Sequence, residues 1–313
     1  MEEAVRKQIR HLTRPGLVAV SGGADSCALS LILKNVSPVP ITIVHVNHHL
    51  RGQESDDDQR FVQSLALQTG IPCRTVSRPV EGDSRIEISA RELRYQWFQE
   101  VAEECQCGWL ATGHTADDQA ETVLHRLIRG TGIAGLGGIP PERAASPDSN
   151  LTIIRPLLTL RRNDLLEYLR ERNQPFRTDS SNHDERFTRN RIRHELLPLL
   201  TTYNPRIVEA VTRLAEQSRE TSDWIESCAE QLLARARRPD AGEITVLDAE
   251  CLAAESPFLV RAAFQRLWCQ KNWPLGEMTA EHWQRLAQRA TADYPGGISV
   301  RCVGKVVQIR RKS

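Results

Sequence analysis

Six consecutive residues near the N-terminus combine two glycines with hydroxyl and carboxylate side chains. Ser21-Gly22-Gly23-Ala24-Asp25-Ser26 follows the apolar run Leu17–Val20, which has the pattern of a buried strand, and a helical pattern begins at once. Adjacent glycines let the backbone turn sharply and leave room for a phosphate at the amides. The helix N-terminus behind them offers unpaired N–H groups and the positive end of its dipole. We therefore predict that this loop binds polyphosphate, with Ser21 and Ser26 as hydroxyl donors.

Asp25 gives the loop a carboxylate that could hold the Mg²⁺ accompanying a polyphosphate. The loop has no Lys, which distinguishes it from the GxxxxGK[ST] loop of kinases and GTPases. A serine-flanked loop with its own carboxylate suits the retention of pyrophosphate as a leaving group. The alternative is a helix cap without further function, since Ser and Asp are common caps. The strand before the loop and the helix after it favour the phosphate site.

A second polar block, Gly113–Thr122, follows another short apolar run and opens a helix. Its acids Asp117 and Asp118 also suit a helix first turn without any catalytic role. If the fold is a parallel sheet, however, this turn lies beside the phosphate loop. The two carboxylates could then share Mg²⁺ with Asp25 (Asp118 above all) or hold an amino-acid ammonium, and Glu121 lies on the same helical face.

Arginines recur at near-helical spacing in a third block, and Asn190 lies among them. A solvated basic face is the usual meaning of such a run. Arginines here could instead neutralise a departing pyrophosphate or clamp an RNA backbone. The arginines of the run are Arg186, Arg189, Arg191 and Arg193. Among the residues of this block, Arg191 is our first candidate for a functional role, and Asp179 is a weaker one.

Histidines are concentrated at the end of the second predicted strand. Strand alternation places His45, Asn47 and His49 on one side and His48 on the other, so a zinc site is disfavoured. Two cysteines, Cys105 and Cys107, form a CxC pair without the spacing of a metal or redox motif.

The elements that must position these groups alternate between strands and helices. Short β-branched runs are separated by amphipathic stretches through the first half of the chain, which predicts an α/β fold with a doubly wound parallel sheet. Ligands of such sheets bind at the carboxyl ends of the strands. We expect strands at 17–21, 41–47, 72–80, 108–114 and 151–158, and helices at 25–36, 54–68, 86–104, 117–129, 161–173, 185–200 and 206–238.

Length and composition limit the class of protein. The 313 residues suggest two domains, and 40% hydrophobic with 26% charged residues is ordinary globular composition. No apolar run approaches the roughly 18 residues of a membrane span. The first residues lack the apolar core of a secretory signal. The eight cysteines are too few for a disulfide scaffold in a chain of this length. We expect a cytoplasmic protein. Charge is uneven, at +3 for residues 151–200 and +5 for 301–313, which permits a polyanionic partner.

The motifs together resemble a known family. The SGGADS loop is similar to that of the N-type ATP pyrophosphatases, or PP-loop superfamily. Four further blocks resemble the tRNA(Ile)-lysidine synthetase family in its order: HVNHHLRG (45–52), GHTADDQAETVLHRLIRGTGIAGLGG (113–138), RPLL (155–158) and DSSNHDERFTRNRIRHELLPLL (179–200).

The resemblance implies ATP-dependent ligation of free L-lysine to a wobble cytidine in a tRNA(Ile) with a CAU anticodon. The cytidine C2 oxygen would attack the α-phosphate of ATP, and the lysine ε-amine would then displace AMP. The implied site residues lie in the blocks already quoted. ATP would contact Ser21, Gly22, Gly23, Ala24, Asp25, Ser26, His45, Val46 and Gly113; lysine and tRNA would contact His114, Asp117, Asp118, Glu121, Arg189 and Arg191; Mg²⁺ would lie at Asp25 and Asp118; and Asp25, Asp117, Asp118 and Arg191 would act in catalysis.

Other readings of the chain are a tRNA thiolase, a small-molecule amide synthetase of the same superfamily, or a non-catalytic tRNA-binding protein. The lack of CxxC pairs disfavours the thiolase, and the intact loop disfavours the binding protein. By resemblance, the turn Leu50-Arg51-Gly52 borders the site, and the glycine-rich segment 129–138 approaches the nucleotide or the tRNA.

The second half of the chain carries fewer signals. We predict a catalytic domain over 1–210 and, over 211–313, a linker helix with a small tRNA-binding domain. The tail 301–313 has the alternation of an edge hairpin with basic residues. The sequence is compatible with a monomer or a homodimer.

Overall fold

The computed structural model of the chain describes residues 1–49, 52–78, 86–178 and 188–312, without the side chains of 86–92. It divides into two compact units, Met1–Glu216 and Gln217–Ser313. Each unit has its own sheet and its own apolar core.

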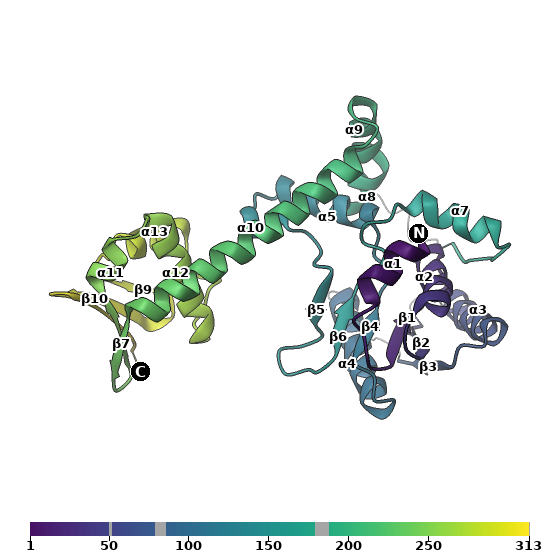
Figure 1. Cartoon of the computed structure of the whole chain (residues 1–313), viewed down its shortest axis with the longest axis horizontal. Coiled ribbons are helices and arrows are strands. Elements are labelled where there is room, and N and C mark those ends of the chain that lie inside the picture. The colour runs from purple at the N-terminus through teal and green to yellow at the C-terminus, as the bar shows by residue number, and fades with distance from the viewer. Residues whose placement is uncertain (50–51, 79–85, 179–187, 313) are drawn as a thin grey trace. The chain divides into compact units, whose positions relative to one another are not determined.

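The first unit contains a mainly parallel sheet with the strand order β3-β2-β1-β4-β6-β5 (Figure 1). All neighbours pair in parallel except β5, which runs antiparallel at one edge. This confirms the predicted α/β fold with a parallel sheet. The strands are β1 (Gly16–Ala19), β2 (Ile41–Asn47), β3 (Cys73–Ser77), β4 (Trp109–Ala111), β5 (Glu142–Ala144) and β6 (Thr152–Ile154).

Helices cover both faces of this sheet because successive strand residues point to opposite sides. Val18 joins a core formed with α1, α2, α3 and α7, whereas its neighbour Leu17 packs on the other face against α4. The described helices of the unit up to residue 171 are α1 (Glu2–Ile9), α2 (Ala24–Val36), α3 (Gln53–Thr69), α4 (Ile86–Glu104), α5 (Ala116–Ile128), α6 (Ile133–Leu136) and α7 (Arg162–Glu171).

The basic segment does not form one regular helix. It consists of α8 (Thr188–Arg191), a π-helical turn η2 (Ile192–Leu196) and α9 (Leu197–Tyr203). Ile192 and Leu197 pack with α5 and with the start of α10 (Ile207–Ala236), so a small core fixes this segment against α5. A π turn widens the helix locally and often marks a functional segment. Periodicity alone predicted the helical run without this distortion.

The glycine-rich segment after α5 is also more ordered than its composition suggests. It contains the short helix α6, and the buried Gln119 side chain accepts a hydrogen bond from the Ile139 N–H at 2.6 Å. Arg126 donates to the carbonyls of Gly135 and Gly138 at 3.0 and 2.9 Å. The face of α5 therefore holds this segment in place.

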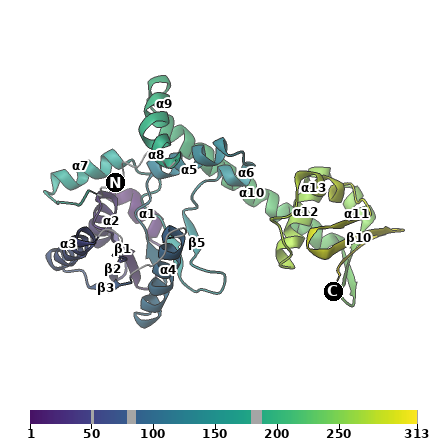
Figure 2. The same ribbon diagram turned by 180° about the vertical axis from the view of Figure 1, so that it is seen from behind.

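The second unit has an antiparallel sheet with the order β7-β8-β11-β10-β9. Figure 2 shows the helices α11, α12 and α13 around this sheet. Its core surrounds the fully buried Trp268, whose ring makes edge contacts with Trp273, Trp283 and Tyr294. The elements are β7 (Arg237–Ala241), β8 (Ile244–Asp248), α11 (Ala249–Ala253), α12 (Pro257–Gln270), α13 (Ala280–Ala287), β9 (Ala292–Tyr294), η3 (Pro295–Gly297), β10 (Ile298–Val303) and β11 (Val306–Arg311).

The prediction of an edge hairpin at the C-terminal tail was wrong. β10 and β11 do pair as a hairpin, but β11 lies between β8 and β10, and β10 lies between β11 and β9. Val307 and Ile309 are fully buried, while the basic residues Arg310 and Arg311 are exposed. The alternation of apolar residues therefore belongs to an interior strand, and the exposed Arg310 and Arg311 lie at the end of that strand.

Candidate functional site

The phosphate loop is shaped by its own side chains. The Ser26 hydroxyl donates to Gly23 O at 2.9 Å and accepts from Ser21 N at 3.2 Å, so this buried serine closes the turn. Gly23 is the N-cap of α2 but provides no side chain, and none caps the helix. Ser and Asp here are therefore not caps in the described structure. The first-turn amides of α2 are the groups that an anion would meet.

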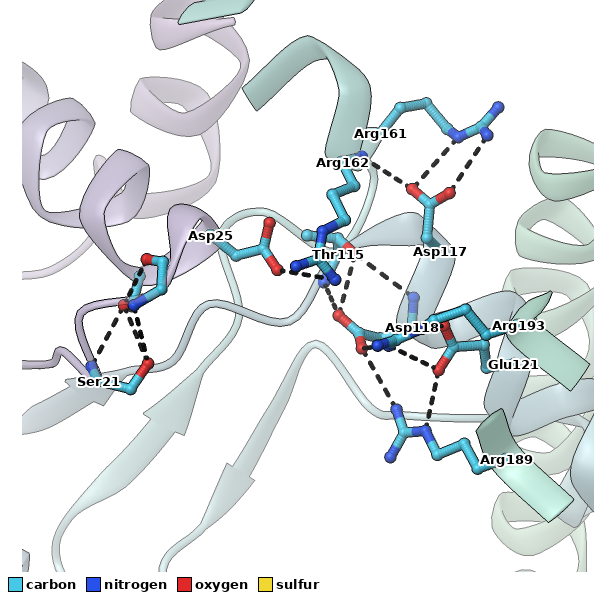
Figure 3. A network of polar contacts seen from close by, with 12 residues as sticks. Ser21, Asp25, Thr115, Asp117, Asp118, Glu121, Arg161, Arg162, Arg189 and Arg193 are labelled. Atoms are coloured by element: carbon cyan, nitrogen blue, oxygen red, sulfur yellow. Dashed lines mark hydrogen bonds and ion pairs between the residues drawn. The ribbon is translucent and has the colours of Figure 1, made fainter. Parts of the chain in front are cut away.

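Asp25 stands in the first turn of α2 and points out of the loop (Figure 3). Burial raises the pKa of Asp25 to about 6, with Arg162 opposing the shift and Asp118 adding to it. One oxygen lies 3.7 Å from Arg162 Nη1, and the other, Oδ1, is buried with no hydrogen-bond partner among the described residues. A buried carboxylate oxygen without a donor fits a cation ligand.

Gly113 lies in the β4–α5 connection and packs against the Ser21–Ser26 loop. A Cβ on Gly113 would lie 3.2 Å from the backbone carbon of Asp25 and from the amide nitrogen of Ser26. Only glycine lets the two backbones approach so closely without a shift. Gly113 therefore lies against the start of α2. His114, the next residue, contacts the Thr112 hydroxyl through Nδ1 at 2.9 Å.

Asp118 belongs to a capping box at the start of α5. Its Oδ2 accepts from the Thr115 amide and hydroxyl, both at 2.9 Å. Its Oδ1 faces two guanidinium groups, at 3.3 Å from Arg189 and 3.5 Å from Arg193 (Figure 3). One carboxylate thus fixes the helix start and also takes part in an ionic network.

Glu121 lies one turn further on and is 1% exposed. Arg193 binds it through two nitrogens, Nε to Oε1 at 2.6 Å and Nη2 to Oε2 at 3.0 Å, and Arg189 Nε binds Oε2 at 2.9 Å. A fork of this kind satisfies a buried carboxylate that would otherwise be costly. Glu121 therefore anchors the basic segment to α5.

Asp117 faces a different partner. Arg161 binds its two oxygens at 3.2 and 3.3 Å, and the backbone N–H of Arg162 donates to it at 2.8 Å (Figure 3). Arg161 also reaches Glu209 at 2.9 Å. Asp117 therefore ties the start of α5 to the start of α7, which places Arg162 near Asp25.

The arginines selected from the sequence separate into two groups. Arg189 and Arg193 face the carboxylates, whereas Arg191 pairs with Glu195 at 3.3 Å and is 62% exposed. Arg186 and Asp179 lie outside the described residues, as do Leu50 and Arg51.

The end of β2 presents His45 and Val46 on opposite sides of the strand. His45 is buried, its Nδ1 lies 2.8 Å from Val20 O, and burial lowers the pKa of His45 despite that contact. A carbonyl only accepts, so Nδ1 carries the proton and Nε2 is a bare acceptor. Val46 is half-buried. Asn47 donates to Asp56 at 2.8 Å and thereby joins β2 to α3.

Three site arginines escaped the sequence reasoning: Arg161, Arg162 and Arg177. Arg161 is the N-cap of the amphipathic helix α7 and Arg162 is its first residue, and nothing in their spacing distinguishes them from surface charge. Arg177 follows Pro175 and Phe176 in a segment without regular secondary structure. The basic excess of residues 151–200 was the one available signal.

Comparison with known proteins identifies the family. The PP-loop domain family matches residues 1–200. A tRNA(Ile)-lysidine synthase of Rhodopirellula baltica is 36% identical over 312 residues, covering 86% of this chain and 78% of that protein. The chain belongs to the tRNA(Ile)-lysidine synthase family. A tRNA(Ile)-lysidine synthase of Porphyromonas gingivalis is 44% identical over 216 residues (67% of this chain, 46% of that protein), and one of Geobacter sulfurreducens is 34% identical over 311 residues (94% and 65%).

These matches confirm the resemblance and the PP-loop ATP-utilising domain. The chain spans 78% of the first of these tRNA(Ile)-lysidine synthases and about half to two thirds of the other two. Among solved structures, the U34-tRNA thiolase NcsA of Methanococcus maripaludis has a TM-score of 0.57 at 18% identity, covering 69% of this chain and 76% of that chain. That likeness shows a shared fold.

Two kinds of feature are absent from the described residues. No group of three or more His, Cys, Asp or Glu side chains there could hold a metal ion. No helix in the same part of the chain is long and apolar enough to cross a membrane.

Proposed function

We propose that this chain is a tRNA(Ile)-lysidine synthase that ligates L-lysine to C2 of the wobble cytidine of a CAU-anticodon tRNA(Ile). The observation that carries the proposal is the match over almost the whole chain to tRNA(Ile)-lysidine synthases. The site geometry agrees with it, because a phosphate loop lies beside the carboxylates Asp118 and Glu121 on a neighbouring helix. A nucleotide and an amine substrate could therefore meet there.

ATP would lie with its phosphates on the Ser21–Ser26 loop and the amides of α2. The cytidine C2 oxygen attacks the α-phosphate, the bond to the β-phosphate breaks, and pyrophosphate leaves. Asp25, with its unpartnered buried oxygen, would hold Mg²⁺, which offsets the negative charge of the phosphates when bound. Arg162, near Asp25, is placed to face the same charge.

Lysine then replaces the oxygen. Its neutral ε-amine attacks C2, the C2–O bond breaks, and the oxygen leaves with AMP. We assign Asp118 as the carboxylate that receives the amine proton, because its Oδ1 is held by the longer contacts from Arg189 and Arg193, at 3.3 and 3.5 Å. Both oxygens of Asp117 are bound by Arg161, and one of them also accepts the Arg162 N–H at 2.8 Å. Glu121 would hold the lysine ammonium together with Asp118. Arg189 and Arg193 must yield part of their contacts for this to happen.

RNA is the remaining substrate. We propose that Arg189, Arg191 and Arg193 meet its phosphates, with the exposed Arg191 the most accessible. The second unit, with its exposed Arg310 and Arg311, would add contacts to the tRNA. The reaction belongs to the cytoplasm, where tRNA, ATP and reduced thiols coexist.

The decisive experiment measures AMP release and incorporation of radiolabelled lysine with Mg²⁺ and ATP. The RNA is a CAU-anticodon tRNA(Ile) transcript, and the matched control carries a substitution at the wobble cytidine. We expect both signals with the first RNA and neither with the second. AMP release without RNA would support a small-molecule synthetase instead. RNA binding without ATP turnover would support a binding protein.

A further inference from the structure

Arg177 lies beside the phosphate loop although it is far from it in sequence. Its backbone N–H donates to Gly22 O at 2.9 Å, and Gly23 and Arg177 form a parallel β-bridge. Gly22 O also accepts from the Cys27 thiol at 3.2 Å. The carbonyl of the first loop glycine is therefore held on the inner side of the loop by two donors.

The planarity of the peptide bond gives this contact a consequence. In a trans peptide the carbonyl of one residue and the N–H of the next point in opposite directions. With Gly22 O held toward Arg177, the Gly23 N–H must point to the opposite side. It lies there 3.4 Å from the hydroxyl of the exposed Ser21, at the mouth of the loop. A phosphate oxygen would approach the Gly23 N–H from that side.

The side chain of Arg177 fixes the backbone that makes this contact. Its Nε donates to Asp58 Oδ1 on α3 at 3.0 Å, and the Asp58 side chain is only 10% exposed. Phe61, on the same face of α3, lies 3.4 Å from the position that a Gly22 Cβ would take, and the Arg177 Cγ lies 3.5 Å from it. The Arg177 stem is therefore packed against the loop, while its head is bound to α3.

We propose that Arg177 and Asp58 are a positioning pair that holds the Gly22–Gly23 peptide with its N–H toward the phosphates of ATP. Neither side chain touches the nucleotide in this assignment. Loss of the pair frees the 176–178 segment from α3, and the peptide can then rotate away from the orientation that binds phosphate. The inference rests on the ATP-binding part of the proposed function.

The test compares the full-length protein with Arg177→Gln, Arg177→Lys and Asp58→Asn. Arg60→Gln is the matched control, because Arg60 also lies on α3 but pairs with the exposed Asp57. Calorimetry with MgATP should show affinity about tenfold lower for Arg177→Gln and Asp58→Asn, the effect of one hydrogen bond to a charged group. Arg177→Lys should recover part of it, and Arg60→Gln should bind like the unmodified protein.

Steady-state kinetics separate positioning from instability. Misfolding lowers the active fraction, and thus the apparent kcat, at unchanged KM. A positioning role predicts a raised KM for ATP and an unaltered KM for lysine. The double variant Arg177→Gln/Asp58→Asn should have the same KM for ATP as either single variant, because both changes remove the same contact. Unchanged ATP affinity in both single variants, or a loss confined to kcat, would overturn the inference.

The two proposals fail in different ways. If the unmodified protein bound ATP but formed no lysidine, the proposed function would fall, and the effect of Arg177 on ATP affinity would still be measurable. If it formed lysidine while the variants bound ATP normally, only the positioning role would fall.

Discussion

Replacing Asp25 with Asn should stabilise the fold while it removes activity. Burial raises the pKa of Asp25 from 3.8 to about 6, so the folded protein holds this proton more tightly than the unfolded chain does. The stability it contributes is therefore complete below pH 3.8 and is lost as the pH rises through 6. Two pKa units correspond to about 3 kcal/mol at most. Because the side chain is 19% exposed, we expect about 2 kcal/mol.

The assay is urea unfolding of both proteins across pH 4 to 8, followed by circular dichroism. The Asn variant should be more stable by about 2 kcal/mol at pH 8, and its advantage should shrink toward zero near pH 4. Carboxylates far from Asp25 contribute equally to both proteins and cancel in the difference. MgATP should stabilise the original protein more than the variant, since the buried oxygen then gains a partner. A pH-independent difference, or a variant less stable at pH 8, would refute the reasoning about burial.

Other variants test the remaining network. Glu121→Gln should cost about 2 kcal/mol in urea unfolding, because it leaves two arginines without their buried partner; an unchanged midpoint would contradict the anchoring role. Asp118→Asn should lower lysine incorporation at least a hundredfold, as loss of a general base does. Asp117→Asn should remain within about tenfold, and equal losses would undo the assignment of the base. Arg193→Gln should slow single-turnover AMP formation more than Arg191→Gln does, because Arg193 binds the buried Glu121 whereas Arg191 forms an exposed ion pair with Glu195. A surface ion pair of that kind contributes at most about 1 kcal/mol to stability. The reverse order would restore Arg191 as the first candidate.

The local pattern was enough to predict the sheet and the loop. Glycines after a buried strand, followed at once by a helical pattern, predicted the tight connection between β1 and α2. Phosphate binding by that connection stays a prediction. Alternation of apolar runs gave the parallel sheet, because both faces of each strand are buried and the strands are separated by helices. The order of the strands and the antiparallel β5 depend on contacts between distant segments, and no local pattern encodes those.

Which carboxylate pairs with which arginine in the site could not be predicted from the sequence. Asp117 and Asp118 are neighbours with identical side chains, yet they bind different arginines because a helix turns about 100° between them. Arg189, Arg191 and Arg193 look equivalent in a basic run, but a helical repeat places the first and third toward Glu121 and the second toward solvent. Periodicity predicts which residues share a face; it does not predict which neighbour that face meets.

The contact between Gly113 and the start of α2 has a consequence for protein engineering. The recognisable motif is the six residues Ser21–Ser26, but the backbone of the β4–α5 connection packs closely against them. A Cβ on Gly113, in that connection, would lie 3.2 Å from the Asp25 backbone. A graft of the loop onto another parallel sheet would lack its support unless the adjacent connection were also free of a side chain. The smallest transplantable binding module is therefore two connections on neighbouring strands, which are nearly ninety residues apart in the chain.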